Sequence, residues 1–341
     1  MNRVSVTPAV CWVLLPLVIV LGLLLSLSLG ASSLSIEQVF GALIGNGNEH
    51  GERVVWELRL PRAVLATVVG LHFALSGCML QALSRNPLAD PGVLGISAGA
   101  SLLAVMLVVG ASMLPAGTSF YLQGDQLLAW LPWGALAGGV LAAVGVFLLS
   151  GSARLTPLKL IVTGVVCAAV LNALMTGVLA LWGQAHTETL VAWLAGSLHG
   201  RDWHHLWVIL PWTLVGLIGV AITLRPLGLL CLNDEQVLSL GLDLGRWRLL
   251  VLLVATLLAA SAVAVAGPIG FVGLVVPHMA RGLVPGKLSH QLGISALLGA
   301  LLVLVADLAG RTLVVPFELP VGVLCALIGV PAFLYLLKQQ P

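Results

Sequence analysis

Long apolar runs recur along the chain, and many of them have the length of a membrane-spanning helix. A helix that crosses a bilayer needs about 20 mainly apolar residues, and ten runs come close to that length. They cover residues 9–29, 62–83, 93–114, 130–150, 158–182, 205–224, 247–266, 270–284, 291–310 and 321–337. The runs are continuous and rich in Leu and Ala, which argues against the alternating strands of a membrane barrel. The pattern predicts an all-α polytopic membrane protein with about ten transmembrane helices.

Composition and charge agree with a single membrane domain over residues 1–341. Hydrophobic residues make up 60% of the chain and charged residues 8%, against about 25% charged residues in soluble domains, so the surface must face lipid. An even number of spans places both termini on one side of the membrane. That side would hold ten of the 15 Lys and Arg residues. Because basic residues favour the cytoplasmic side, both termini are expected to be cytoplasmic.

Signals for an energy source or a catalytic centre are scarce. The nearest match to a nucleotide-binding P-loop, Gly286-Lys287, is followed by Leu288 and lacks the first glycine, so it does not fit that motif. The five cysteines are isolated from one another, which argues against a metal cluster or a disulfide framework. Ionisable residues within the apolar runs, which ion-coupled carriers use, are few. We expect a transport subunit that is not an enzyme, binds no metal or cofactor and takes its energy from a partner.

Two polar segments between the apolar runs have a helical pattern of their own. On the outer side, residues 36–40 are expected to begin a short helix that lies in the membrane interface. On the cytoplasmic side, residues 226–247 form what we call the coupling segment. Asn233 or Asp234 is a good N-cap and Gly241 a good stop signal. This pattern predicts a short amphipathic helix that docks on a partner, with an ordinary connecting loop as the alternative.

Four motifs stand in order along the chain. They are Arg59-Leu60-Pro61-Arg62, the Pro- and Gly-rich stretch from Gly77 to Ala100, the stretch from Gly267 to Arg281, and the stretch from Glu318 to Pro331. Together they resemble the FecCD family of permeases, the membrane subunits of importers for ferric siderophores, haem and vitamin B12. The resemblance covers nearly the whole chain.

The resemblance implies a type II ABC importer permease in a bacterial inner membrane. Its expected partners are two ATPase subunits on the cytoplasmic face, which bind ATP and Mg²⁺, a periplasmic or lipid-anchored substrate-binding protein, and a second permease chain that is a copy or a paralogue. No nucleic-acid partner is expected. A ferric siderophore is the favoured substrate, because the segment from Gly200 to Trp203 looks like the ferric citrate and catecholate branches. Haem and cobalamin import, and an ion-coupled secondary carrier, stay as alternatives.

The resemblance also implies roles for individual residues. Docking of the binding protein is expected at three exposed outer cations, Arg59, Arg62 and Arg311, with headgroup anchoring as the alternative. Coupling to the ATPase is expected at Asn233, Asp234, Glu235, Leu238, Gly241, Leu242 and Arg246. The translocation path and gate are expected in the fifth run and at its cytoplasmic mouth just before it, at Thr156, Pro157, Leu158, Thr163, Gly164, Asn172 and Thr176. Pro157 and Leu158 depart from the small hydroxylated residues that the family often has there.

A last group of residues is expected to shape the backbone. Proline lacks an amide donor and glycine permits close approach of helices, so such residues favour bends and broken helices beside a path. The group comprises Asn86, Pro87, Pro91, Gly95, Gly267, Pro268, Pro277, His278 and Pro320. The alternative role for the stretch from Asn86 to Gly95 is a packing hinge only.

Overall fold

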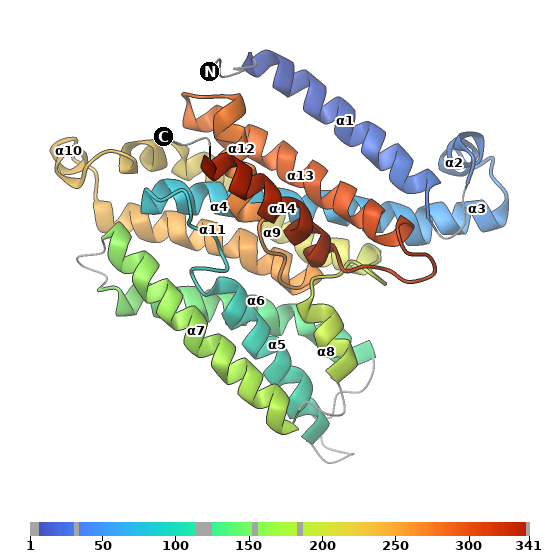
Figure 1. The fold of residues 1–341 in the computed structure, drawn as a ribbon, viewed down its shortest axis with the longest axis horizontal. Helices are drawn as coiled ribbons and strands as arrows, with labels where there is room; N and C mark the ends of the chain where they lie inside the picture. The colour runs from blue at the N-terminus through green and yellow to red at the C-terminus, as the bar shows by residue number, and fades with distance from the viewer. Residues whose placement is uncertain (1–6, 31–33, 114–124, 152–155, 183–186, 339–341) are drawn as a thin grey trace. The chain divides into compact units, whose positions relative to one another are not determined.

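The computed structural model describes residues 7–30, 34–113, 125–151, 156–182 and 187–338, and within these ranges every regular element is a helix. Figure 1 shows their arrangement. The elements are α1 (Pro8–Ser28), α2 (Ile36–Leu43), α3 (Glu49–Arg53), η1 (Val54–Arg59), α4 (Leu60–Ser84), α5 (Ile96–Met113), α6 (Asp125–Leu149), α7 (Pro157–Trp182), α8 (Thr187–Leu194), α9 (Trp203–Leu230), α10 (Asp234–Ser239), α11 (Leu244–Ala266), α12 (Val272–Leu283), α13 (Leu288–Thr312) and α14 (Val321–Lys338).

Each of the ten apolar runs overlaps one of the longer helices, but these helices differ in length. By length and composition, seven helical stretches in the described part of the chain can cross a membrane, among them α1, α7, α11 and α13. α5 and α14 are each 18 residues long, and both are mainly apolar. The eighth run is the 12-residue helix α12. The expectation of about ten transmembrane helices therefore agrees with the ten longer helices of the described residues, of which the 12-residue α12 is too short to cross the bilayer by itself.

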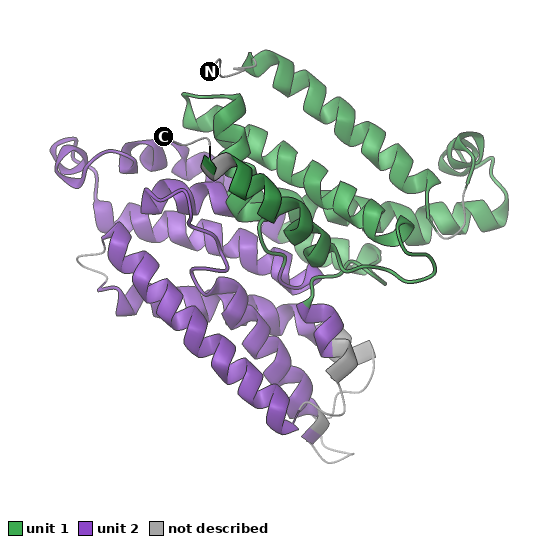
Figure 2. Cartoon of the chain, viewed as in Figure 1, with its two compact units in different colours: residues 1–75, 195–211, 269–341 green, residues 76–194, 212–268 purple. Residues whose placement is uncertain are grey.

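The chain forms two compact units, which Figure 2 distinguishes by colour. Unit 1 comprises residues 1–75, 195–211 and 269–341, and unit 2 comprises residues 76–194 and 212–268. Each unit combines distant parts of the chain, and two of the four boundaries between the units fall within the continuous helices α4 and α9. The single domain expected from the sequence stays a prediction.

In unit 1, α13 packs against α1, α12 and α14. Small residues permit the closest of these approaches. A Cβ atom on Gly70 of α4 would lie only 2.1 Å from the carbonyl oxygen of Gly299 of α13, so no larger residue fits at that crossing. Glycine contacts of this kind let helix backbones touch in a membrane, where apolar side chains gain nothing by leaving lipid.

In unit 2, α6 packs against both α5 and α11, and α7 packs against α5. The same glycine device recurs, because a Cβ atom on Gly99 of α5 would lie 2.5 Å from the carbonyl oxygen of Gly138 of α6. α11 is almost wholly buried from Leu258 to Ala266. It ends at Gly267, whose φ of +75° is favourable for glycine alone.

Two of the predicted backbone motifs coincide with helix boundaries. The break between α11 and α12 runs from Gly267 to Phe271, and Phe271 also has a positive φ of +68°. Pro277 lies buried inside α12, and His278 beside it is half-buried. At the start of α14, the carbonyl of Pro320 accepts a hydrogen bond from the Val323 amide at 3.1 Å.

Candidate functional site

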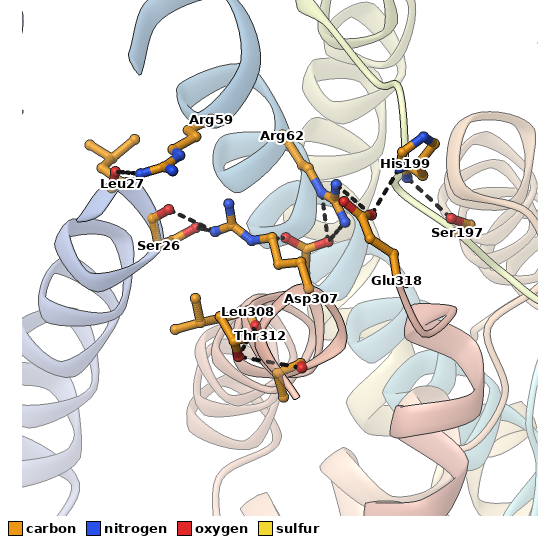
Figure 3. A network of polar contacts seen from close by, with 12 residues as sticks. Ser26, Leu27, Arg59, Arg62, Ser197, His199, Asp307, Leu308, Thr312 and Glu318 are labelled. Atoms are coloured by element: carbon orange, nitrogen blue, oxygen red, sulfur yellow. Dashed lines mark hydrogen bonds and ion pairs between the residues drawn. The ribbon is translucent and has the colours of Figure 1, made fainter. Parts of the chain in front are cut away.

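Arg62, in the first turn of α4, binds two carboxylates that lie far away in the sequence (Figure 3). Its Nε and Nη2 atoms lie 2.9 and 2.8 Å from Oδ1 of Asp307 on α13. Its Nη1 donates to Oε2 of Glu318 at 2.9 Å. Asp307 also pairs with Arg311 one turn further along α13, with Nε 3.5 Å from Oδ2. A guanidinium fork matched to carboxylates in this way gives strong, directional hydrogen bonds.

The other two arginines hold the carboxyl end of α1. Arg59 Nη1 donates to the carbonyls of Leu27 and Ser28 at 2.6 and 3.0 Å. Arg311 Nη2 donates to the Ser26 carbonyl at 2.7 Å and also to the Ser26 hydroxyl. The last carbonyls of a helix lack partners within the helix and form its negative end. Two cations therefore complete the hydrogen bonding of α1 and balance its dipole.

We call Arg59, Arg62, Arg311, Asp307 and Glu318 the arginine cluster. The expectation that its three arginines are exposed cations is wrong, since Arg59 and Arg311 are 6% and 7% exposed. The Arg62 side chain is 11% exposed. The physical reason is that every guanidinium finds its partners inside unit 1, at α1, α13 and the segment before α14.

Glu318 and His199 are the parts of this network that reach the surface, and neither was assigned a role from the sequence. The side chains are 32% and 72% exposed, and His199 Nδ1 lies 2.9 Å from Glu318 Oε2. A backbone hydrogen bond positions the segment that carries Glu318, because the Leu319 amide donates to the Gly310 carbonyl of α13 at 2.9 Å. Partial burial would raise the pKa of the Glu318 carboxyl, but the hydrogen bond from His199 and the charge of Arg62 outweigh burial and lower it.

The coupling segment contains the short helix that the sequence predicts. Asn233 is the N-cap of α10, and its amide donates to the Gln236 side chain at 3.3 Å. Gly241 stops the helix with φ +77°. Val237 is fully buried, whereas Leu238 and Leu240 are 59% and 61% exposed. α10 is therefore fastened on one side and presents large apolar side chains on the other.

Asp234 fastens the helix. Its Oδ1 accepts from Arg85 Nη2 at 2.7 Å and from Arg248 Nη2 at 2.6 Å. Arg85, just after α4, also donates from Nε to the Leu230 carbonyl at 2.9 Å. Burial would raise the pKa of Asp234, but the hydrogen bonds from Arg248 and Arg85 outweigh it and hold the pKa below its usual value.

The remaining residues of the predicted coupling set lie around this anchor. Asp234 was expected to meet a partner, but the structure engages its carboxylate inside unit 2. Arg85 and Arg248 were missed, although Arg85 stands within one of the sequence motifs. Exposed or half-exposed positions in the set are Asn233, Glu235, Leu238, Gly241, Leu242 and Arg246.

The sequence model of the FecCD transport family matches residues 17–339. The chain belongs to the FecCD transport family. The iron(3+)-hydroxamate import system permease protein FhuG of Bacillus subtilis is 36% identical over 324 residues, 95% of each chain. The Fe(3+) dicitrate transport system permease protein FecD of Escherichia coli is 40% identical over 295 residues, 86% of this chain and 87% of FecD.

A solved structure of an inward-facing ABC transporter, assigned to the metal-chelate type, is 30% identical with a TM-score of 0.84, covering 98% of this chain and 100% of that one. The protein is thus a multi-pass membrane permease with the type II importer fold and a subunit of an ABC transporter. The family, fold class and subunit type expected from the sequence are confirmed.

In this FecCD permease, α7 is the helix expected to line the path, and its predicted residues fall on different sides. Thr156, Leu158, Asn172 and Thr176 are exposed, Pro157 and Thr163 are half-buried, and Gly164 is buried. Leu158, Asn172 and Thr176 share one face at helical spacing. Gly164 lies on another face, where a Cβ atom would come 2.9 Å from Leu94 Cα. Within this chain Gly164 is a packing residue, because only glycine permits that approach.

The loop that packs on α7 is the Pro- and Gly-rich stretch before α5. Its turns use side chains as acceptors: Asn86 Oδ1 accepts from the Leu88 amide at 2.9 Å, and Asp90 Oδ1 from the Gly92 amide at 2.7 Å. Burial raises the pKa of Asp90 to about 6. Gly95, with φ +78°, sits against α7, where a Cβ atom would come 3.3 Å from the Ala168 amide nitrogen. The loop residues and Gly164, predicted separately, are thus in contact within unit 2.

Proposed function

We propose that this permease imports ferric siderophores or related iron(III) chelates across the bacterial inner membrane. FhuG belongs to an iron(3+)-hydroxamate import system and FecD to an Fe(3+) dicitrate transport system. The two relatives differ in the chelating group and share ferric iron. The chemistry common to both supports a ferric chelate as the substrate class for this chain.

The observation that carries the proposed mechanism is the construction of α10. Two arginines hold α10 at its first residue, Asp234, and the exposed Leu238 and Leu240 form an apolar surface, which we call the apolar knob. Large apolar side chains exposed to water favour burial against a protein surface, at about 25 cal/mol per Å² of apolar area. We assign this knob to docking of a separate ATPase subunit on the cytoplasmic face. Two such subunits, one per permease chain, would bind ATP and Mg²⁺ and supply the energy.

On the outer face, the proposed partner is a periplasmic or lipid-anchored substrate-binding protein. The three arginines would contribute to docking mainly by fixing the positions of α1, α4 and α13, because their guanidinium groups already bind partners within this chain. Arg62 reaches the surface through Glu318 and His199. These two exposed groups are the polar contacts that a binding protein would meet.

The proposed path runs along the exposed face of α7, with a second permease chain opposite. That face carries Val162 and Val165 beside Asn172 and Thr176. Weakly polar, mostly apolar lining suits passage of a large chelate, because tight binding sites would hold it back. The second chain is expected to be a copy of this one or a paralogue.

Uptake of radioactive iron tests this function. A strain that lacks the chromosomal copy is complemented with the wild-type chain and given iron-55 as ferric hydroxamate, ferric citrate, ferric catecholate or haem, with labelled cobalamin in parallel. We expect uptake of at least one siderophore complex to return with the chain. Restoration of haem or cobalamin uptake alone would overturn the assigned substrate class.

A further inference from the structure

The outer surface of α2 has an apolar face that nothing in the described part of the chain covers. Ile36, Phe40 and Ile44 follow one another at four-residue spacing, so they lie on one side of the helix. They are 67%, 50% and 70% exposed. Three large apolar side chains in a row on an eight-residue helix and its C-cap form a continuous apolar stripe.

The rest of the helix surface is accounted for. Val39 and Ala42 are each 1% exposed and form a small core with Leu27 of α1 and Val55 of η1. Polar positions occupy a third side, where the Gln38 amide donates to the Ser35 hydroxyl and closes a capping box. α2 is thus an amphipathic helix with one apolar side packed inside unit 1 and a second apolar side left exposed.

The position of α2 places this stripe at a membrane boundary. α1 is one of the helices long and apolar enough to span the bilayer, and α2 lies at the end of α1 away from the N-terminus (Figure 1). In that view α1 lies in the plane and α2 is seen nearly end-on, so α2 runs crosswise to the spanning helix. The apolar side chains of α1 that face outward continue to Leu29, which is 42% exposed.

Trp56 lies beside the end of α2 and also indicates a position at the membrane boundary. Its indole Nε1 donates to the Ala42 carbonyl at 2.9 Å, near the end of α2, while the side chain stays 42% exposed. Tryptophan is enriched at the interface between hydrocarbon and headgroups, where the ring can contact acyl chains while its N–H group donates a hydrogen bond. The three stripe residues are uncharged, and the exposed Glu37 borders the stripe on its polar side, as expected where acyl chains meet headgroups.

We propose that α2 is an interfacial membrane helix, with Ile36, Phe40 and Ile44 inserted at the boundary between the headgroups and acyl chains of the outer leaflet. Amphipathic helices that lie in the plane of a membrane bury one apolar face to that depth. The lipid that contacts the stripe belongs to the same bilayer that covers the outward apolar side chains of α1. α2 then anchors the outer end of α1, whose last carbonyls the arginine cluster holds. This placement depends on α1 spanning the membrane and not on the substrate or the ATPase.

Collision of a spin label with oxygen and with a water-soluble nickel chelate tests the placement. The complete importer is reconstituted in vesicles of phosphatidylethanolamine and phosphatidylglycerol. Cys167 and Cys231, the two cysteines that are not buried, are replaced by serine. Labels are then placed singly by Phe40→Cys on the stripe, by Gln38→Cys on the polar side, and by Leu21→Cys on α1 as the lipid reference.

We expect the label at position 40 to collide with oxygen several-fold more than with the nickel chelate, as at position 21, and the label at position 38 to show the reverse. Preference for the nickel chelate at position 40 would mean that water covers the stripe. Collision with neither reagent would mean that a protein covers it. Either result overturns the proposal, and neither bears on iron uptake.

Discussion

The arginine cluster and the coupling segment are each built around an aspartate held by two arginines, yet they leave different chemistry at the surface. Asp307 lies between Arg62 and Arg311 and is completely buried. The side chain of Asp234, between Arg85 and Arg248, is 36% exposed. In the first arrangement, the charged groups bind one another and the end of α1, and so join α1, α4 and α13. The second fixes the base of α10 and leaves Leu238 and Leu240 exposed. The same ionic motif therefore joins helices in one unit and positions exposed apolar side chains in the other, where we propose that the ATPase docks.

The largest expected effect is on the stability of the arginine cluster. Asp307→Asn keeps the shape but leaves two buried guanidinium groups without their shared carboxylate. Removing one partner from a buried ionic network costs about 3–5 kcal/mol. We expect a clear fall in the thermal unfolding temperature of the purified permease, followed by tryptophan fluorescence.

The matched control is Glu57→Gln, which breaks an exposed pair with Arg53 at 3.7 Å. Exposed pairs contribute about 0–1 kcal/mol, so this variant should unfold close to the wild type. Equal unfolding temperatures for Asp307→Asn and the wild type would show that the cluster does not stabilise unit 1.

The second effect is local and concerns the base of α10. Arg248→Met removes a charged hydrogen bond worth about 1.5–3 kcal/mol while Arg85 still holds Asp234. We expect amide hydrogen exchange at Val237 to rise by about tenfold or more, because α10 opens locally. Arg246→Met, two residues away at an exposed position, is the control and should leave exchange unchanged. If Arg248→Met instead lowered the unfolding temperature of the whole permease, as expected for Asp307→Asn, the two sites would not differ in the way described.

The third effect is on binding with no change in folding. Leu238→Ala shortens an exposed side chain, so the unfolding temperature should not move. Its loss should weaken capture of the ATPase subunit by about tenfold, from the apolar area of one leucine. Ser239→Ala on the same helix is the control. Undiminished ATPase capture by Leu238→Ala would break the assignment of α10.

The smallest effect is a pH dependence at Glu318. Its pKa in the folded protein is lower than in the unfolded chain, so its stabilisation is present above the ordinary carboxyl pKa of about 4.3 and is lost as the pH falls through the lowered value. We expect less than about 1 kcal/mol. Unfolding temperatures of the wild type should drop more steeply on acidification than those of Glu318→Gln. Parallel curves for the two proteins would contradict the pairing with Arg62 and His199.

The helices and α10 were predictable because their causes are local. Apolar runs of spanning length identify the long helices, and a cap at Asn233 with a stop at Gly241 identifies the short one. The partners of the arginines were not predictable, since Arg62 stands 245 and 256 residues before the carboxylates that it binds. A charged residue beside an apolar run suggests an exposed position, and only the packing of α1 and α13 shows that these guanidinium groups are buried. Asp234 lies on the predicted helix, and its role in coupling stays a prediction. Its contacts with Arg85, just after α4, and with Arg248 on α11 were not predictable, because both arginines are distant from it in the sequence.

The central claim is that this chain imports a ferric chelate only with energy from a partner ATPase. The most direct measurement is iron-55 chelate uptake into vesicles that contain the permease, its ATPase and its binding protein. We expect accumulation when ATP and Mg²⁺ reach the ATPase, and none from an imposed proton or sodium gradient. Accumulation driven by a gradient in the absence of ATP would contradict it.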